Sequence, residues 1–360
     1  MLKIMFYINA IHAGGAERVM LNLAKFFSEN GYDAILVTSF RDTWEYPVPP
    51  MVKRYSLEEQ EIRQSKIARN FSRIAGLRCL CKKERPDVLI AFMAEPNFRA
   101  ILATAGLKTK TIISVRNDPN REYRRKLHRI AARLLFPFAN GCVFQTEEAS
   151  EWFPRKLQNK SRIIMNAVKE QFFDLERKPR INEIVTCGRL DTQKNHRMLI
   201  RAFFHVHQNV PTSKLRIYGE GMEREKLQAE IVRLGLEQCV ALEGQIDDVE
   251  NALTHGDVFV LSSDYEGMPN GLLEAMAAGL PCISTDCPCG GPSQVIQDGE
   301  SGLLVPVNDA ERMAEAILKL LGDREKMRVL GGNARKEAER FRPEIVHREW
   351  ENYVREVLHR

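Results

Sequence analysis

The stretch VFVLSSDYEGMPNGLLEAMAAGLPCIST, residues 258–285, holds two short apolar runs on either side of a helical pattern. The runs VFVLSS (258–263) and PCIST (281–285) have the length and composition of strands that are covered on both faces. Residues 270–278 between them have helical periodicity and many small side chains. A strand, a helix and a strand in succession predict two parallel strands joined by a crossover helix.

The same alternation continues along the whole chain. Strands are predicted at 3–8, 34–39, 88–92, 111–115, 142–146 and 162–166, and then at 183–188, 214–219, 240–244, 258–263 and 281–285. Helices are predicted at 16–30, 61–84, 96–105 and 121–137, and then at 195–208, 222–234, 247–254, 270–278, 310–321, 323–340 and 343–358. Two parallel sheets in series, each covered by helices, predict an α/β protein with two Rossmann-like domains.

The domain boundaries are predicted in the least patterned part of the chain, NAVKEQFFDLERKPRINE (166–183). We expect an N-terminal domain over residues 1–168, a hinge over 169–182 and a C-terminal domain over 183–342. The last helix, within 343–360, is a candidate to cross back onto the first domain.

The composition is that of an ordinary globular protein, with 360 residues, 44% apolar positions and 28% charged positions, and this length suits two domains. The eight cysteines have no metal-ligand spacing, which suits a reducing compartment. No run approaches the roughly 20 apolar residues of a membrane-spanning helix. The first residues, MLKIMFYINAIHAGG, indicate a strand and a turn, not a signal peptide. We therefore expect a cytoplasmic protein.

Positive charge is concentrated in the first half of the chain. Residues 60–165 contain 22 Lys and Arg against 9 Asp and Glu, although the net charge of the whole chain is only +5. The two basic helical stretches, 61–84 and 121–137, contain Arg63, Lys66, Arg69, Asn70 and Arg73, beside apolar Ile67, Phe71, Ile74 and Leu77, and then Arg121, Arg124, Arg125, Lys126, Arg129 and Arg133. Basic amphipathic helices bind anionic lipid, although a solvated charged face is the commoner origin of a charge run.

The size of the charge excess favours an anionic partner for the first domain, either a membrane surface or a lipid diphosphate. We expect the protein to lie peripherally at the inner face of the cell membrane. No aromatic residues are interleaved to stack on bases, so nucleic acid is not an expected partner.

Residues that follow the strands are the first candidates for ligand contacts, because parallel sheets bind ligands at the carboxyl ends of their strands. Gly14 and Gly15 follow the first strand and allow close approach of an anion to a helix N-terminus, or simply a tight turn. Gly188, Arg189 and Lys194 follow the first strand of the second half, where an Arg and a Lys together favour a phosphate site. Neither glycine pattern is G-x-G-x-x-G, which disfavours a dinucleotide-binding dehydrogenase.

Two glutamates frame the helix start in the opening stretch. Glu266 lies in the loop after the strand, and Glu274 is predicted in the first turn of a helix with Asn270 as its N-cap. A carboxylate at either position can accept hydrogen bonds from vicinal hydroxyls. Acidic residues are also favoured in a first turn by the helix dipole, which is the structural alternative for Glu274.

Three motifs together resemble the retaining glycosyltransferases of family 4. They are G-G-A-E-R at 14–18, G-R-L-D-x-x-K-N at 188–195 and E-G-x-P-x-x-x-x-E-A-x-A-x-G-x-P at 266–281. The resemblance covers essentially the whole chain and is strongest to bacterial enzymes that extend lipid-linked or surface oligosaccharides, including N-acetylgalactosaminyltransferases acting on undecaprenyl diphosphate sugars. It implies the GT-B fold, in which two Rossmann-like domains face a central cleft.

The resemblance also implies roles for the residues of the donor site. Arg189 and Lys194 would hold the diphosphate of a UDP-sugar, Glu274 the ribose hydroxyls and Glu266 the transferred sugar. Further donor contacts would come from backbone groups at Asn270, Gly271 and Leu272, from Gly14, Gly15 and Gly188, and, at the nucleotide base, from Gly244 and Gln245.

Two cations and a helix N-terminus can stabilise a departing diphosphate, so we expect no metal ion and no other cofactor. Many family members carry a His where this chain has Arg116, so that residue is a candidate for a donor or acceptor phosphate, or for a structural pair with Asp118. Glu95, Asn97 and His12 are further candidates for acceptor contacts.

We expect a retaining glycosyltransferase that moves a hexose or N-acetylhexosamine from a UDP-sugar to a lipid-linked or soluble saccharide acceptor. A sugar-nucleotide epimerase of the same fold and a non-catalytic sugar-nucleotide-binding subunit are the alternatives. The epimerase would act on a donor alone, and the subunit would need a partner for activity.

Overall fold

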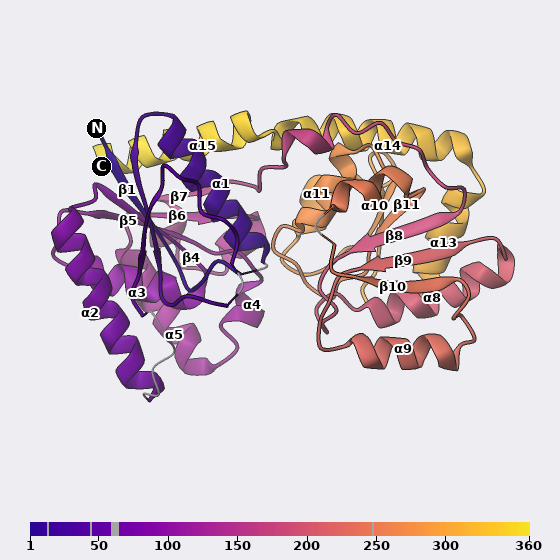
Figure 1. Ribbon diagram of the computed structural model, residues 1–360, viewed down its shortest axis with the longest axis horizontal. Coiled ribbons are helices and arrows are strands. Elements are labelled where there is room, and N and C mark those ends of the chain that lie inside the picture. The colour runs from indigo at the N-terminus through magenta and orange to yellow at the C-terminus, as the bar shows by residue number, and fades with distance from the viewer. Residues whose placement is uncertain (13, 44, 59–64, 247) are drawn as a thin grey trace. The chain divides into compact units, whose positions relative to one another are not determined.

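The computed structural model describes residues 1–12, 14–43, 45–58, 65–246 and 248–360. It divides the chain into two compact units (Figure 1). Unit 1 contains Met1–Asn166 together with Glu344–Arg360, and unit 2 contains Ala167–Pro343. Predictions for Ala13, Arg63 and Asp247 lie outside the described residues.

Unit 1 is a seven-stranded parallel sheet in the order β3-β2-β1-β4-β5-β6-β7. Its strands are β1 (Lys3–Ile8), β2 (Asp33–Thr38), β3 (Lys53–Ser56), β4 (Val88–Phe92), β5 (Lys110–Ser114), β6 (Gly141–Phe144) and β7 (Ser161–Ile163). Its helices are α1 (Gly15–Glu29), α2 (Lys66–Glu84), α3 (Ala94–Thr104), α4 (Pro119–Glu122), α5 (Lys126–Leu135), α6 (Glu147–Glu151), α7 (Arg155–Gln158) and α15 (Pro343–His359), with a 3₁₀ turn at Phe136–Phe138.

Alternating side chains of the central strands cover both faces of this sheet. Met5 and Tyr7 of β1 belong to a core cluster with Leu77 of α2, whereas Phe6 lies against Phe27 of α1 at a ring distance of 5.9 Å. This is the period of two that a strand buried on both sides requires. On the α1 face, helix α15 from the C-terminus contributes Trp350, whose ring lies 5.7 Å from that of Phe92.

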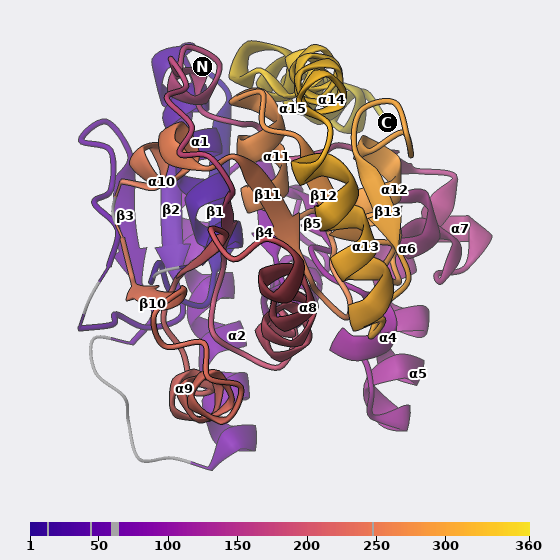
Figure 2. The same ribbon diagram turned by 90° about the vertical axis from the view of Figure 1, so that its right-hand side faces the viewer.

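Unit 2 is a six-stranded parallel sheet in the order β10-β9-β8-β11-β12-β13. Its strands are β8 (Glu183–Cys187), β9 (Lys214–Tyr218), β10 (Val240–Gly244), β11 (Val258–Leu261), β12 (Cys282–Thr285) and β13 (Leu303–Val305). Its helices are α8 (His196–Asn209), α9 (Arg224–Arg233), α10 (Val249–His255), α11 (Asn270–Ala277), α12 (Gly291–Val295), α13 (Ala310–Leu321) and α14 (Arg324–Ala338), with 3₁₀ turns at Glu170–Phe172 and Glu339–Phe341. Figure 2 shows the elements of this unit from the side.

Several predicted elements differ from the observed ones. Strands β3 and β13 and helices α6, α7 and α12 were not predicted, and each spans only three to five residues. The predicted helix 121–137 is two helices, α4 and α5, because Tyr123 turns into the core between them and is fully buried. The part of 61–84 that the structure describes as helix begins at Lys66.

The segment predicted as a hinge, 169–182, is hydrogen-bonded to unit 2. The backbone N–H of Lys178 donates to the carbonyl of Thr254, and that of Arg180 donates to the carbonyl of His255, each at 2.9 Å. The Arg177 guanidinium donates to the Gly256 carbonyl at 2.7 Å. No helix in the described ranges is long and apolar enough to cross a membrane.

Candidate functional site

In both sheets the strand order reverses at one point, between β1 and β4 in unit 1 and between β8 and β11 in unit 2. Such a switch point leaves a crevice at the carboxyl ends of the two central strands, and open α/β sheets bind their ligands there. In unit 2 the two loops at this point are residues 188–195 and 262–269. They carry Arg189, Lys194 and Glu266, which sequence analysis selected for donor contacts.

Lys194 and Glu266 form an ion pair across these two loops. Lys194 Nζ lies 2.5 Å from Glu266 Oε1, and both side chains are largely buried. Ser263 Oγ donates to the same oxygen at 2.6 Å, and Gln193 Nε2 donates to Glu266 Oε2 at 3.2 Å. The carboxylate is therefore fixed in orientation by three donors, and charge-assisted bonds of this kind are the strong ones.

The backbone holds the two loops together as well. Asp264 N–H donates to the Gln193 carbonyl at 2.8 Å, and Ser262 Oγ donates to the Lys194 carbonyl at 2.8 Å. Asn195 adopts a left-handed conformation as the N-cap of α8, where its side chain accepts from the N–H of Met198. Sequence analysis gave no role to Ser263, which lies three residues before Glu266, or to Gln193, which directly precedes Lys194.

Arg189 does not converge on Lys194. Its side chain is 65% exposed, and Arg189 Nη2 lies 3.2 Å from Asp191 Oδ2. Gly188 precedes it, and an added Cβ there would lie 3.2 Å from Cε of Lys194. The site thus has one exposed cation, paired with Asp191, and one largely buried cation, paired with Glu266.

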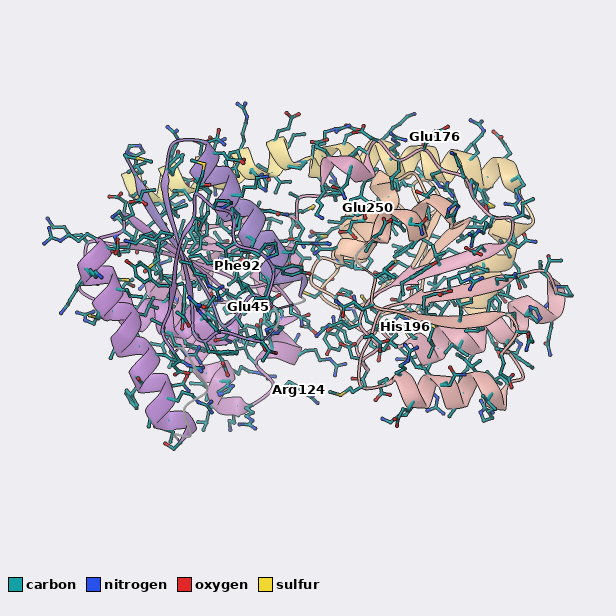
Figure 3. All side chains as sticks on the ribbon, in the orientation of Figure 1. Glu45, Phe92, Arg124, Glu176, His196 and Glu250 are labelled. Atoms are coloured by element: carbon teal, nitrogen blue, oxygen red, sulfur yellow. The ribbon has the colours of Figure 1, made fainter. Side chains whose placement is uncertain are left out.

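Next to this loop, His196 is the first residue of α8 and is almost completely buried (Figure 3). Burial lowers the pKa of His196 to about 4, and the positive charge of Lys194 adds to the lowering. The imidazole is therefore neutral at pH 7, and Lys194 and Arg189 carry the positive charge of the loop. Sequence analysis gave no role to this histidine.

Helix α11 differs from the prediction at its start. Its N-cap is Pro269 and Asn270 is its first residue, so Glu274 lies in the second turn and is buried. Burial raises the pKa of Cys187 at the end of β8, and the negative charge of Glu274 raises it further, so the Glu274 carboxyl lies near that strand end. An added Cβ on Gly271 would lie 3.1 Å from the Cys187 carbonyl oxygen, which shows how closely α11 approaches β8. Leu272 is fully buried.

The first residue of the short helix α12, Gly291, packs closely against the loop that carries Glu266. An added Cβ on Gly291 would lie only 1.8 Å from the Gly267 carbonyl oxygen, so only glycine allows this contact. Gly244 and Gln245 lie two strands away from the switch point, after the edge strand β10, where Gly244 has φ = 80° and Gln245 is exposed.

In unit 1 the loops at the switch point carry the predicted glycines and acceptor residues. Gly14 is the N-cap of α1 and Gly15 its first residue, and an added Cβ on Gly14 would lie 2.0 Å from Glu17 Oε2. An acid therefore lies over the helix N-terminus where sequence analysis expected a diphosphate. His12 is exposed, with Nδ1 3.4 Å from Asp42 Oδ2.

Glu95 and Asn97, both candidates for acceptor contacts, lie in different environments. Glu95 is 63% exposed, but Asn97 is fully buried, where its Nδ2 donates to the Ser114 carbonyl at 2.8 Å and its Oδ1 accepts from the Ser114 N–H. Asn97 thus holds α3 against β5. Before them, Met93 has φ = 79°, a conformation that is costly for a residue with a side chain and that clusters at functional sites.

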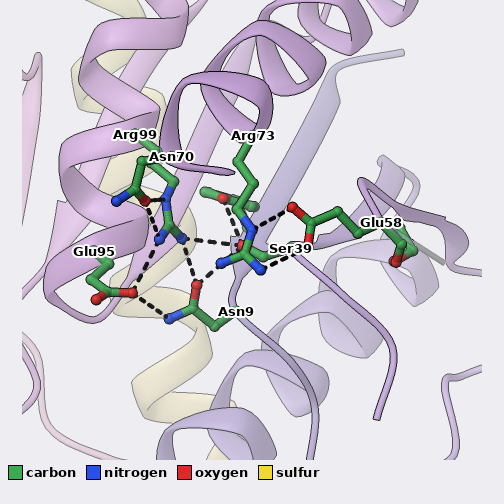
Figure 4. A network of polar contacts seen from close by, with 9 residues as sticks. Asn9, Ser39, Glu58, Asn70, Arg73, Glu95 and Arg99 are labelled. Atoms are coloured by element: carbon green, nitrogen blue, oxygen red, sulfur yellow. Dashed lines mark hydrogen bonds and ion pairs between the residues drawn. The ribbon is translucent and has the colours of Figure 1, made fainter. Parts of the chain in front are cut away.

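A polar network at the same edge orients Glu95 (Figure 4). The buried guanidinium of Arg99 donates to Asn9 Oδ1 at 2.6 Å, to Asn70 Oδ1 at 2.7 Å and to Glu95 Oε2 at 3.1 Å. Arg73 forms a second buried pair with Glu58 at 2.8 Å. Sequence analysis placed Arg73 and Asn70 on a basic helix face expected to meet an anionic partner, but Arg73 pairs with Glu58 and Asn70 accepts from Arg99.

Arg116 is buried two residues beyond β5. Its side chain contacts Ser114 and Asn166 and not Asp118, whose carboxylate accepts from the Asn120 N–H. In the described part of the chain, no group of three or more His, Cys, Asp and Glu residues is placed to hold a metal ion.

Two parallel α/β units, with paired acids and cations at the switch point of the second, define a GT-B glycosyltransferase. The chain matches the model "Glycosyltransferase Family 4" over residues 13–172 and the model "Glycosyl transferases group 1" over residues 167–337, and it belongs to the family 4 glycosyltransferases.

Similar proteins are known from several bacteria. An α-1,4-N-acetyl-D-galactosaminyltransferase of Campylobacter jejuni, named for the acceptor GalNAc-α-(1→4)-GalNAc-α-(1→3)-diNAcBac-PP-undecaprenol, is 28% identical over 99% of both chains. A second Campylobacter jejuni enzyme, a diphospho-undecaprenol 4-α-N-acetylgalactosaminyltransferase, is 27% identical over 95% of this chain and 96% of its own. Among solved structures, Anabaena HepE in complex with UDP and glucose has a TM-score of 0.82 and 17% identity, covering 98% of this chain and 99% of its own.

Proposed function

We propose that this glycosyltransferase moves a hexose or N-acetylhexosamine from a UDP-sugar to a lipid-linked saccharide, with retention of configuration, in bacterial glycan biosynthesis. The Lys194–Glu266 pair at the switch point of unit 2 carries the proposal. It places a cation for a phosphate next to a carboxylate that can accept hydrogen bonds from sugar hydroxyls. The names of the two Campylobacter relatives contain undecaprenol, which supports a lipid-linked acceptor. The UDP complex of Anabaena HepE supports a uridine nucleotide.

The ion pair is compatible with both proposed roles. An ammonium group has three N–H donors, so Lys194 can keep its bond to Glu266 and still donate to a phosphate oxygen. Glu266 Oε2 accepts one bond from Gln193 and has capacity left for a sugar hydroxyl. Arg189, which is exposed, can turn from Asp191 to the leaving diphosphate and stabilise its charge.

We propose that the reaction needs no metal ion, since Arg189 and Lys194 supply two positive charges for the leaving group. Transfer should therefore continue at full rate in excess EDTA. Loss of transfer in EDTA that Mn²⁺ restores would contradict this part of the proposal.

The donor site is tested by thermal-shift measurements with a panel of UDP- and GDP-sugars. The donor should raise the Tm, following RT ln(1 + [L]/Kd), and Glu274→Ala should reduce that shift. Glu311→Ala, which changes an exposed acid in the first turn of α13, is the matched control and should leave the shift unchanged. Equal shifts in both variants would count against Glu274 as a donor ligand.

The reaction is tested by product analysis with the isolated chain. Release of UDP that requires the acceptor, with an α-linked product from an α-linked donor in NMR, is the expected result. Turnover of the donor alone would favour the epimerase, and inactivity of the isolated chain that a partner protein restores would favour a non-catalytic subunit.

We further propose that α5 binds an anionic membrane surface. Leu127, Ile130 and Leu134 lie on one face of α5 at helical spacing, and they are exposed together with Phe138. The basic residues Lys126, Arg129 and Arg133 are exposed on the adjacent face. An apolar face bordered by cations suits the interface of anionic lipids, where each Lys or Arg is worth about 1 kcal/mol.

Sedimentation with vesicles containing anionic lipid tests this surface. Wild type should sediment at low salt, and Leu127→Ser with Leu134→Ser should weaken the binding. Val232→Ser, at an exposed apolar position of unit 2, is the control. Equal sedimentation of all three proteins would contradict the assignment to α5.

A further inference from the structure

Arg116 is a buried cation with no carboxylate partner in the described part of the chain. Only 8% of the residue is exposed. Its Nη2 donates to Asn166 Oδ1, its Nη1 lies 3.4 Å from Ser114 Oγ, and its Nε is buried without a hydrogen-bond partner. The guanidinium lies 4.5 Å from the ring centre of Phe92, which Figure 3 labels at the end of β4.

The other buried arginines near the same sheet edge are compensated. Arg73 is paired with Glu58 at 2.8 Å, and Arg99 reaches Glu95 at 3.1 Å (Figure 4). A buried charge without a counter-ion is costly, and folded proteins keep such groups rarely. Burial lowers the pKa of Arg116 to about 9, which still leaves the guanidinium charged at neutral pH.

The groups around Arg116 are neutral and are already oriented. Asn166 Oδ1 accepts from Arg116 and also from Gln145 Nε2 at 2.8 Å. Phe92, Arg116, Gln145 and Asn166 follow or end four neighbouring strands, β4 to β7, at the carboxyl edge where a parallel sheet binds ligands. This edge therefore holds a fixed positive charge, and none of the residues that the structure describes supplies its negative partner.

We infer that Arg116 is the centre of an oxyanion-binding subsite in unit 1, which takes a phosphate or a carboxylate group of a substrate. A planar guanidinium with an unpartnered Nε can form a two-bond contact with such a group. The assignment of the oxyanion to a substrate rests on the proposed transferase function. The presence of the subsite rests only on the uncompensated charge and its place in the sheet.

The first test measures stability. Removal of an arginine that supports the fold lowers the stability of the protein, whereas removal of an arginine kept for a ligand does not. Arg116→Met should have a Tm equal to or above that of wild type, and Arg73→Met, which breaks the pair with Glu58, should have a lower Tm. A fall for Arg116→Met as large as that for Arg73→Met would overturn the inference.

The second test measures ligand binding by hydrogen exchange in the full chain. Inorganic pyrophosphate or glucuronate should protect residues 114–118 in wild type. Arg116→Met should raise the ligand concentration needed for half-maximal protection at least tenfold, and Arg116→Lys should raise it by less. Protection by pyrophosphate alone assigns a phosphate, and protection by glucuronate alone assigns a carboxylate. Absence of protection by both probes, or equal protection in Arg116→Met, would overturn the subsite.

The two proposals fail separately in this experiment. UDP should protect residues 188–195 of unit 2, and that protection should be lost in Lys194→Met and kept in Arg116→Met. Loss of the UDP effect with retention of the pyrophosphate effect at 114–118 would reject the donor site and leave the Arg116 subsite standing.

Discussion

At the scale of single residues, the buried contact between Lys194 and Glu266 decides how the donor site is built. Lys194→Met would leave the Glu266 carboxylate buried without its cation, so we expect the free energy of unfolding to fall by about 3–5 kcal/mol. Glu266→Gln in the same chain should restore part of that loss, because no charge is then left unpaired. Urea unfolding of wild type, the two single variants and the double variant measures the coupling energy between the two side chains. Strictly additive effects would show that the pair contributes nothing to stability.

Glu122 provides a prediction of pH dependence. Its Oε1 accepts from the Ala94 N–H at 2.9 Å, whereas its Oε2 is buried without a partner among the described residues. Burial raises the pKa of Glu122 to about 7 from the ordinary value of 4.5. Between these two values the folded protein holds a proton that the unfolded chain has lost, so the contribution of Glu122 to stability declines as the pH rises through this window.

Glu122→Gln removes that dependence, since an amide does not titrate. The free energy of unfolding of the variant minus that of wild type should therefore be larger at pH 8 than at pH 5, by roughly 1–3 kcal/mol. Urea unfolding at the two pH values is the measurement. A difference between the proteins that stays constant with pH would mean that Glu122 is not the group responsible.

At the scale of helices and strands, two adjacent glycines in α14 report on the packing of α11. An added Cβ on Gly331 would lie 2.4 Å from the carbonyl oxygen of Gly279, just beyond α11, but one on Gly332 would meet nothing within 4 Å. Gly331→Ala should therefore destabilise the protein by about 1–3 kcal/mol, whereas Gly332→Ala should stabilise it by about 0.5–1 kcal/mol. Thermal unfolding of both variants is decisive, since equal effects would contradict the close approach of the two helices.

The elements that the sequence pattern predicted well are those with long apolar runs. Strand β4 and helix α13 have the predicted bounds, because each is anchored by its own buried side chains. Strand β3 was missed because KRYS is partly exposed at a sheet edge, and β13 was missed because it has only three residues. The positions of Arg189, Lys194 and Glu266 after strands were predictable, but their partners depend on how loops distant in the sequence meet, which no local pattern contains.

The same limit explains the errors in unit 1. The spacing of Arg73 and Asn70 along α2 is that of a solvated face. Only tertiary contacts, with Glu58 and with Arg99, give them their polar partners, and Arg73 is buried as a result. Ile67 and Phe71 were predicted on the apolar side of the helix but are exposed, because the core side of α2 is formed by Leu77 and its neighbours further along the helix.

At the scale of the whole molecule, the C-terminal helix belongs to the first unit although the second unit separates them in sequence. Residues 344–360 lie in unit 1, and α15 buries Val346, Trp350, Tyr353, Val354 and Val357 there. Tyr353 Oη accepts from the Cys142 N–H at 2.7 Å and donates to the Lys160 carbonyl at 2.5 Å. Unit 1 is therefore complete only after residues 344–360 have been synthesised.

Deletion of residues 344–360 should unfold unit 1 and leave unit 2 folded. Five buried side chains at about 1.5–3 kcal/mol each amount to roughly 8–15 kcal/mol, which equals the whole stability of a typical domain. Hydrogen exchange should then lose protection in β6, to which Tyr353 of α15 is hydrogen-bonded at Cys142, and keep it in β8 and β11. Deletion of only the exposed His359 and Arg360 is the control and should change neither. Protection that persists in β6 after the longer deletion would mean that unit 1 folds without α15.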